Sequence, residues 1–203
     1  MAWFYGVYLK DSKLATSLDL VRFLCEPRAI RFSHITLRGP LSRKLQETWV
    51  DQQNTNRKFE WRVRFMRPSR FMSDTQATIF VNVDLGTLSP LWQKPDFPDG
   101  TPHVTLYDGK SQEFASRLRN VLAKYEFASW VPVTKLQIIQ KKHKIDEVFH
   151  ASFEPFYHMF SECIGDPTRI PKMQYSTDNE RLKYIDHVLS KNFPLAELRR
   201  KSA

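Results

Sequence analysis

A short pattern occurs twice in this chain. Residues 32–40 read FSHITLRGP and residues 101–109 read TPHVTLYDG, so His, an aliphatic residue, Thr and Leu recur in that order, each time ahead of a glycine. Alternate residues of a β-strand point to the same face of a sheet. The pattern therefore predicts two strands, each presenting a histidine beside a threonine: His34 with Thr36, and His103 with Thr105.

The segments around these stretches predict a repeated order of strand, turn and helix. Apolar and polar residues alternate in 58–67 and in 77–84, as in strands with one buried face, although Phe80 falls among the polar residues of the second segment. An internal repeat of this kind indicates two lobes, each supplying one histidine and one threonine. Helices are expected over 12–25, 42–53 and 110–127, the last two directly after turns at Gly39–Pro40 and at Gly109.

The charge of the chain favours an anionic partner. Its 31 lysine and arginine residues outnumber its 22 aspartate and glutamate residues, which gives a formal net charge of +9. A positive field attracts nucleic acid, nucleotides or acidic lipid, although basic residues also serve solubility alone. No apolar run approaches the ~18 residues of a membrane span, and two cysteines are too few for a disulfide framework. We therefore expect a cytoplasmic protein with no membrane attachment.

The two tetrapeptides HITL and HVTL, the second preceded by Pro102, resemble the paired motifs of the two-histidine (2H) phosphoesterase superfamily. This superfamily includes LigT-like RNA ligases and cyclic phosphodiesterases. The opening FYGVYL is similar to the family's first strand, and the resemblance covers about residues 1–140. It implies an α+β fold of two pseudo-symmetric lobes, with antiparallel sheets lining a central cleft and helices outside. It also implies that no metal or other cofactor takes part, and it assigns the acid and base to His34 and His103 and phosphate binding to Thr36 and Thr105.

Phosphodiester cleavage explains why such a site needs two imidazole groups. Without a metal ion, a base must remove a proton from the attacking oxygen while an acid protonates the leaving oxygen. Imidazole has an unperturbed pKa of about 6.5, so it performs either task near neutral pH. Threonine hydroxyls can donate hydrogen bonds to the nonbridging oxygens, where negative charge must be held.

The expected function is therefore a metal-independent phosphodiesterase that acts on RNA or nucleotides. Its substrate would be a 2′,3′-cyclic phosphate or a 2′-5′ or 3′-5′ phosphodiester, signalling oligonucleotides included. The sequence leaves open which histidine is the acid, and whether water or a ribose hydroxyl attacks. The alternative is a catalytically inactive module that binds RNA or a nucleotide on the same scaffold.

Four further residues are candidates for substrate binding. Arg38 and Tyr107 each follow their threonine by two positions, so strand geometry places them on the catalytic face. There Arg38 could pair with phosphate and Tyr107 could stack on a base. Arg62 and Arg64 lie on the polar side of a predicted strand and would contact phosphates if that side lines the cleft. The alternative is that charged residues on an exposed strand are simply solvated and that a single aromatic residue belongs to the core.

Residues 141–203 are predicted to form a mainly helical extension beyond the core of residues 1–140. Thr177 and Glu180 predict a capping box that opens a helix through about Lys191. The inward-facing residues of this helix would be Leu182, Ile185, Val188 and Leu189. A further aromatic stripe at helical spacing consists of Phe153, Phe156, Tyr157 and Phe160. The extension either packs on the catalytic core or forms a lid or a partner surface.

Other kinds of site find little support. The chain has no glycine-rich phosphate loop, no HExxH motif and no cysteine pair at zinc spacing. His143, His150 and His158 match no standard ligand pattern, so we expect no metal there. We expect a monomer whose partner is its RNA or nucleotide substrate.

Overall fold

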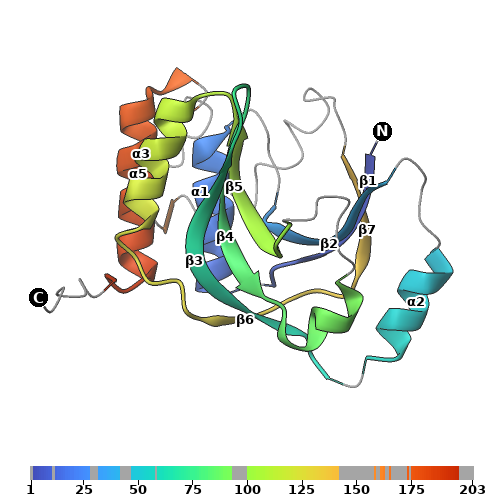
Figure 1. Cartoon of the computed structure of the whole chain (residues 1–203). Coiled ribbons are helices and arrows are strands. Elements are labelled where there is room, and N and C mark those ends of the chain that lie inside the picture. The colour runs from blue at the N-terminus through green and yellow to red at the C-terminus, as the bar shows by residue number, and fades with distance from the viewer. Residues whose placement is uncertain are drawn as a thin grey trace, which may run out of the picture.

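The structure is a computed structural model that describes residues 2–10, 12–27, 32–41, 47–57, 59–92, 100–141, 158, 161–162, 165, 173 and 175–196. In this part of the chain, seven strands form one sheet in the order β6-β3-β4-β5-β2-β1-β7, and every neighbouring pair is antiparallel. Helices pack beside the sheet (Figure 1), so the expected α+β class is confirmed. The strands are β1 (Ala2–Tyr8), β2 (His34–Leu41), β3 (Arg62–Met72), β4 (Ala77–Asp84), β5 (His103–Gly109), β6 (Trp130–Pro132) and β7 (Gln137–Lys141).

The helices stand in two places around the sheet. Figure 1 shows α1 (Lys13–Cys25), α3 (Gln112–Leu122) and α5 (Asp178–Asn192) grouped together, whereas α2 (Glu47–Thr55) lies at the opposite side of the molecule, near β7. A short 3₁₀-helix, η1 (Gly86–Leu91), follows β4. The hydroxyls of Ser12 and Ser111 accept hydrogen bonds from the first turns of α1 and α3, which satisfies amide groups that would otherwise lack partners.

The sheet has two faces of different chemistry. One face, which we call the helix face, carries apolar side chains that are fully buried: Val7, Ile35, Val63, Val81 and Val104. We call the opposite face the histidine face, because the alternation that buries Ile35 and Val104 leaves His34 and His103 on it. Each half of the sheet thus contributes one histidine to a common face.

The two halves of the sheet meet at a narrow seam. One half consists of β1, β2 and β7, and the other consists of β3, β4, β5 and β6. Between β2 and β5 the register is set by the pair Ile35–Val104. Residues 130–141 join the halves a second time, because β6 pairs with β3, Val133 bridges Leu9, and β7 pairs with β1.

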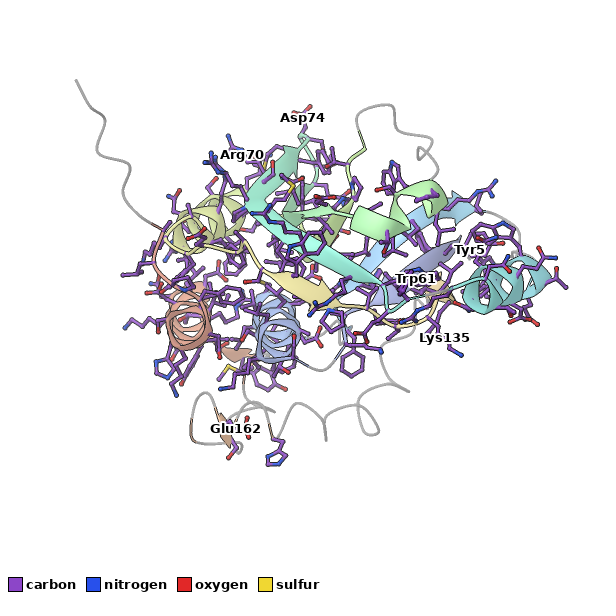
Figure 2. The ribbon with its side chains drawn as sticks, turned by 90° about the horizontal axis from the view of Figure 1, so that it is seen from below. Tyr5, Trp61, Arg70, Asp74, Lys135 and Glu162 are labelled. Carbon is purple, nitrogen blue, oxygen red and sulfur yellow. The ribbon has the colours of Figure 1, made fainter. Side chains whose placement is uncertain are left out.

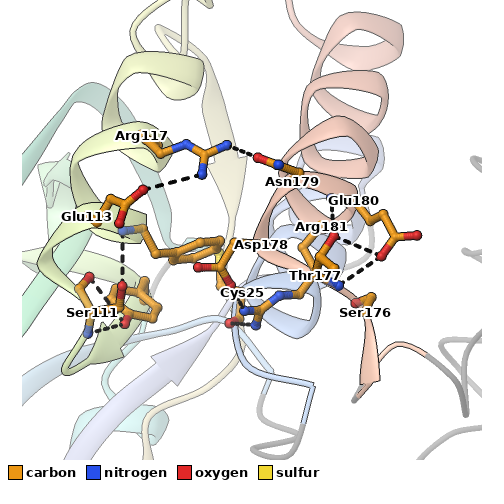
Figure 3. Close-up of polar contacts among 12 residues, drawn as sticks. Cys25, Ser111, Glu113, Arg117, Ser176, Thr177, Asp178, Asn179, Glu180 and Arg181 are labelled. Carbon is orange, nitrogen blue, oxygen red and sulfur yellow. Dashed lines mark hydrogen bonds and ion pairs between the residues drawn. The ribbon is translucent and has the colours of Figure 1, made fainter.

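The C-terminal helix α5 is built as the sequence predicts. Thr177 and Glu180 form the capping box, and the four expected residues of α5 are buried against the rest of the core. Arg181 donates to the carbonyl oxygen of Cys25 at the end of α1 and pairs with Asp178 (Figure 3). Its guanidinium also lies over the ring of Phe114 of α3, 4.9 Å from the centroid. The helix therefore packs on the core through both α1 and α3.

Several predicted boundaries differ from those observed. The expected turn at Gly39–Pro40 is wrong, because β2 continues to Leu41, which pairs with Trp3. Gly39 adopts φ +116°, and a Cβ at that position would lie 2.7 Å from the carbonyl oxygen of Trp3. The glycine thus permits an irregularity within the strand rather than a turn. The aromatic stripe Phe153, Phe156, Tyr157 and Phe160, together with His143 and His150, lies outside the described residues.

The strand predicted over 58–67 begins and ends later than expected. It is β3, which starts at Arg62 and continues to Met72, so that Trp61 and Arg70 lie near its two ends (Figure 2). Val63 and Phe65 are buried as predicted, whereas Phe59 is 78% exposed. The extra length of β3 brings Phe71 onto the sheet.

Candidate active site

The seam between β2 and β5 brings the two His–Thr pairs together. Counting outward from the pair Ile35–Val104, the register sets His34 opposite Thr105 and Thr36 opposite His103. In a regular antiparallel pair, residues directly opposite have Cβ atoms about 5 Å apart and diagonal neighbours about 7–8 Å apart. The two histidines are such diagonal neighbours, on one face of the sheet, and each faces the threonine of the other half.

Both imidazole rings are held by the same kind of hydrogen bond. Nδ1 of His34 lies 3.0 Å from the carbonyl oxygen of Phe32, and Nδ1 of His103 lies 2.6 Å from that of Thr101. A carbonyl oxygen only accepts, so each Nδ1 carries the proton and Nε2 is the nitrogen that can gain or lose one. The two rings are thus held in the same tautomer by the residue two positions earlier.

The surroundings of His103 favour its neutral form. Its ring lies 4.6 Å from the ring of Phe80, a residue that is 2% exposed although it belongs to the histidine face. Desolvation by this burial lowers the pKa of His103, and the hydrogen bond to Thr101 and the charge of Asp108 offset part of the effect. Tyr8 stands beside His34, with ring centroids 5.8 Å apart. Burial raises the pKa of the Tyr8 hydroxyl, so this group remains a neutral donor near pH 7.

The two threonine hydroxyls are available to a ligand. Thr36 and Thr105 are partly exposed, and within the described residues neither side chain makes a hydrogen bond. A hydroxyl in that state can donate to an anionic oxygen at no cost to an internal bond. The arrangement therefore offers two proton-transfer groups and two donors at one place on the sheet.

The expected position of Tyr107 on the same face is wrong. Phe80 pairs with Thr105, but the next residue of β4, Ile79, pairs with Tyr107, so a β-bulge at Leu106 shifts the strand by one residue. Tyr107 consequently points to the helix face, where its ring packs 5.1 Å from that of Phe114 and is 6% exposed. Its hydroxyl accepts a hydrogen bond from the amide of Ser111, and burial raises its pKa.

The same irregularity occurs in the other half and displaces Arg38. Gly6 pairs with Thr36, and the preceding residue, Tyr5, pairs with Arg38, so Leu37 is the additional residue. Tyr5 belongs to the helix face, where its ring lies 4.7 Å from that of Trp49. The register therefore places Arg38 away from His34, contrary to prediction. The two bulges follow the two motifs at the same position.

Arg62 and Arg64 are exposed and lie on the side of β3 that the sequence indicates. Arg64 pairs with Asp84, which shares the histidine face with Asn82, the partner of His103. With strands about 4.8 Å apart and about 3.4 Å per residue, Arg64 is roughly 12 Å from His103 along the sheet. The arginines therefore border the site and do not belong to its centre.

Sequence reasoning missed Phe71 and Tyr8. Phe71 lies beyond the predicted end of β3, and its ring stacks on Phe80 and meets His103 edge-on at 5.9 Å. The sequence offered one indication of Phe71. Phe80 is the one apolar residue among the polar positions of its strand, so another apolar residue is expected to cover it. Tyr8 pairs with His34 and shares its face. Alternation along β1 shows which residues lie on the same face as Tyr8, but the pairing of β1 with β2 is needed to tell that this is the face of His34.

Comparisons with known proteins identify no family for this chain. Searches against protein-family models, curated proteins and solved structures find no match. In the ranges that the structure describes, no three histidine, cysteine, aspartate or glutamate residues stand close enough to hold a metal ion. Within those same ranges, no helix has the length and hydropathy required to cross a membrane.

Proposed function

We propose that the chain is a metal-independent phosphodiesterase of the two-histidine type that acts on RNA or nucleotides. The observation that carries the proposal is the pair Ile35–Val104, whose register puts His34, Thr36, His103 and Thr105 on one face of the sheet. The corresponding Nδ1 hydrogen bonds of the two histidines support it, because they fix the same tautomer in both rings and make Nε2 the nitrogen that exchanges a proton. A bilobal 2H fold is part of the same proposal, and the repeated bulge after each motif favours it.

In the proposed reaction, His103 acts as the base and His34 as the acid. Burial beside Phe80 favours neutral His103, which can accept a proton through Nε2. For a 2′,3′-cyclic phosphate, His103 takes a proton from water while the water oxygen bonds to phosphorus. The bond from phosphorus to one ribose oxygen breaks, and the imidazolium of His34 gives its proton to that oxygen. Thr36 and Thr105 donate to the nonbridging oxygens as charge develops.

The second candidate is a binding module for RNA or nucleotides that lacks turnover. The exposed Arg62 and Arg64 favour it, because such groups bind phosphates without chemistry. This function predicts salt-sensitive affinity for RNA and no product with any substrate.

A substrate panel in the presence of EDTA tests the proposal. It comprises 2′,3′-cyclic mononucleotides, 2′-5′ and 3′-5′ oligonucleotides and cyclic dinucleotides, with product separated by chromatography. We expect turnover by the wild type to fall by about 10²–10⁴-fold in His34→Ala and in His103→Ala, the usual contribution of a general acid or base. His187→Ala is the matched control, because His187 is exposed on α5.

Two outcomes would contradict the proposal. Loss of turnover on addition of EDTA would exclude the metal-free mechanism. Equal turnover in His34→Ala and the wild type would exclude a symmetric pair of proton-transfer groups. The position of the phosphate in the product distinguishes attack by water from attack by a ribose hydroxyl.

A further inference from the structure

Phe71 presents an exposed aromatic surface beside one of the two histidines. It pairs with Thr78 across β3 and β4 and therefore lies on the histidine face. Its side chain is 42% exposed, yet one side of the ring is fixed against Phe80, with centroids 4.5 Å apart and planes 28° from parallel. Phe80 is 2% exposed and contacts His103 in turn. The three rings form one cluster whose outer member remains open to a ligand.

The charge next to Phe71 restricts what that ligand can be. Thr78 pairs with Phe71 on one side and with Asp108 on the other, so the three residues form a row across the sheet. Asp108 accepts hydrogen bonds from Thr78 (2.8 Å) and Gln76 (2.5 Å) through Oδ1. A carboxylate in this row repels phosphate but tolerates a neutral ring. The phosphate of the substrate is therefore expected to bind at the threonine hydroxyls, and an uncharged part of the substrate is expected to bind against Phe71.

We propose that Phe71 is the platform on which a nucleobase of the substrate stacks, on the His103 side of the reacting phosphate. The inference rests on the proposed function and deepens it: the site binds the purine or pyrimidine of the substrate directly, and it thereby distinguishes a nucleotide from a phosphodiester without a base. A base offers a flat π-surface of the size of the phenyl ring, and stacking of this kind tolerates any base. Phe80 contributes by holding the ring of Phe71 in place.

The test compares two substrates that differ only in the base. They are adenosine 2′,3′-cyclic phosphate and methyl ribofuranoside 2′,3′-cyclic phosphate, and the measured quantity is the ratio of their kcat/KM values. We expect the wild type to prefer the nucleotide by about 5- to 150-fold, which is the range that 1–3 kcal/mol of base stacking produces. The ratio should fall toward one in Phe71→Ala and be retained in Phe71→Trp. The control is Phe59→Ala, because Phe59 is 78% exposed and precedes β3.

The ratio separates a base subsite from a merely structural role. If Phe71 only holds the ring of His103 in position, Phe71→Ala lowers kcat/KM for both substrates by the same factor. An unchanged ratio of the two kcat/KM values would therefore overturn the inference. A wild-type ratio near one overturns it as well, while the phosphodiesterase activity stands. If the wild type cleaves neither of these cyclic phosphates, the proposed function is decided by the full substrate panel, and the subsite is tested by calorimetric binding. Adenosine 2′-phosphate should then bind more tightly than methyl ribofuranoside 2′-phosphate, and Phe71→Ala should remove the difference; equal affinities overturn the inference.

Discussion

Replacement of Tyr107 by phenylalanine tests whether the β-bulge at Leu106 turns Tyr107 away from the histidine face, where the sequence predicts it. The hydroxyl of Tyr107 accepts from the amide of Ser111 at 3.0 Å, just where α3 begins, and the ring packs on Phe114. Phenylalanine keeps the ring and removes the acceptor. We therefore expect a loss of about 1 kcal/mol, the net value of one intramolecular hydrogen bond. In a domain of this size, that corresponds to a fall in Tm of about 2–4 °C.

Urea denaturation, thermal unfolding and kinetics on the same variant check this expectation. Turnover and KM should equal those of the wild type, because the hydroxyl of Tyr107 lies on the helix face. Tyr175→Phe is the control, since Tyr175 is 79% exposed and should unfold as the wild type does. A Tyr107→Phe variant with unchanged stability and a raised KM would place the hydroxyl at the substrate and refute the reasoning from the bulge.

Four further predictions address the C-terminal helix, the titration of His103 and strand β3. Thr177→Ala removes the capping box of α5 and should cost about 1 kcal/mol in chemical denaturation without changing turnover. The pKa of His103 in the folded protein lies below the 6.5 of a free histidine. As the pH drops, His103 is therefore protonated in the unfolded chain before it is protonated in the folded one, and the free energy of unfolding should fall below about pH 6.5. Phe71→Ala exposes His103 to more water and raises its pKa. The acid limb of the plot of kcat/KM against pH should therefore move to higher pH. In binding of single-stranded RNA, Arg64→Ala should reduce the slope of log K against log salt by about 0.7, whereas Arg119→Ala on α3 should not.

Local patterns in the sequence were sufficient to locate α5 and the face of each histidine. The capping box of α5 depends on Thr177 and Glu180, three residues apart, and its buried positions follow from helical spacing. The faces of His34 and His103 follow from alternation over only three residues, from each histidine to its threonine. Signals of this length need no knowledge of which strands pair.

Features that depend on pairing could not be predicted in this way. Alternation assumes an uninterrupted strand, and a bulge reverses every face beyond it. The bulges at Leu37 and Leu106 become visible only in the register with β1 and β4, so Arg38 and Tyr107 were assigned to the wrong face. Phe71 was missed for a related reason, because the length of β3 is set by its pairing with β4.

The continuous stretch from Trp130 to Lys141 has a consequence for the behaviour of the protein at high concentration. It supplies both outer strands of the sheet, β6 beside β3 and β7 beside β1. Open strand edges are the places where sheets of different molecules join and begin to aggregate. Here β6 is three residues long and ends on Pro132, which has no amide hydrogen to offer, and Val133 is already bridged to Leu9. One segment that closes the two halves of the sheet thereby also protects the edge of β3 from association with another sheet where β6 covers Arg62–Arg64.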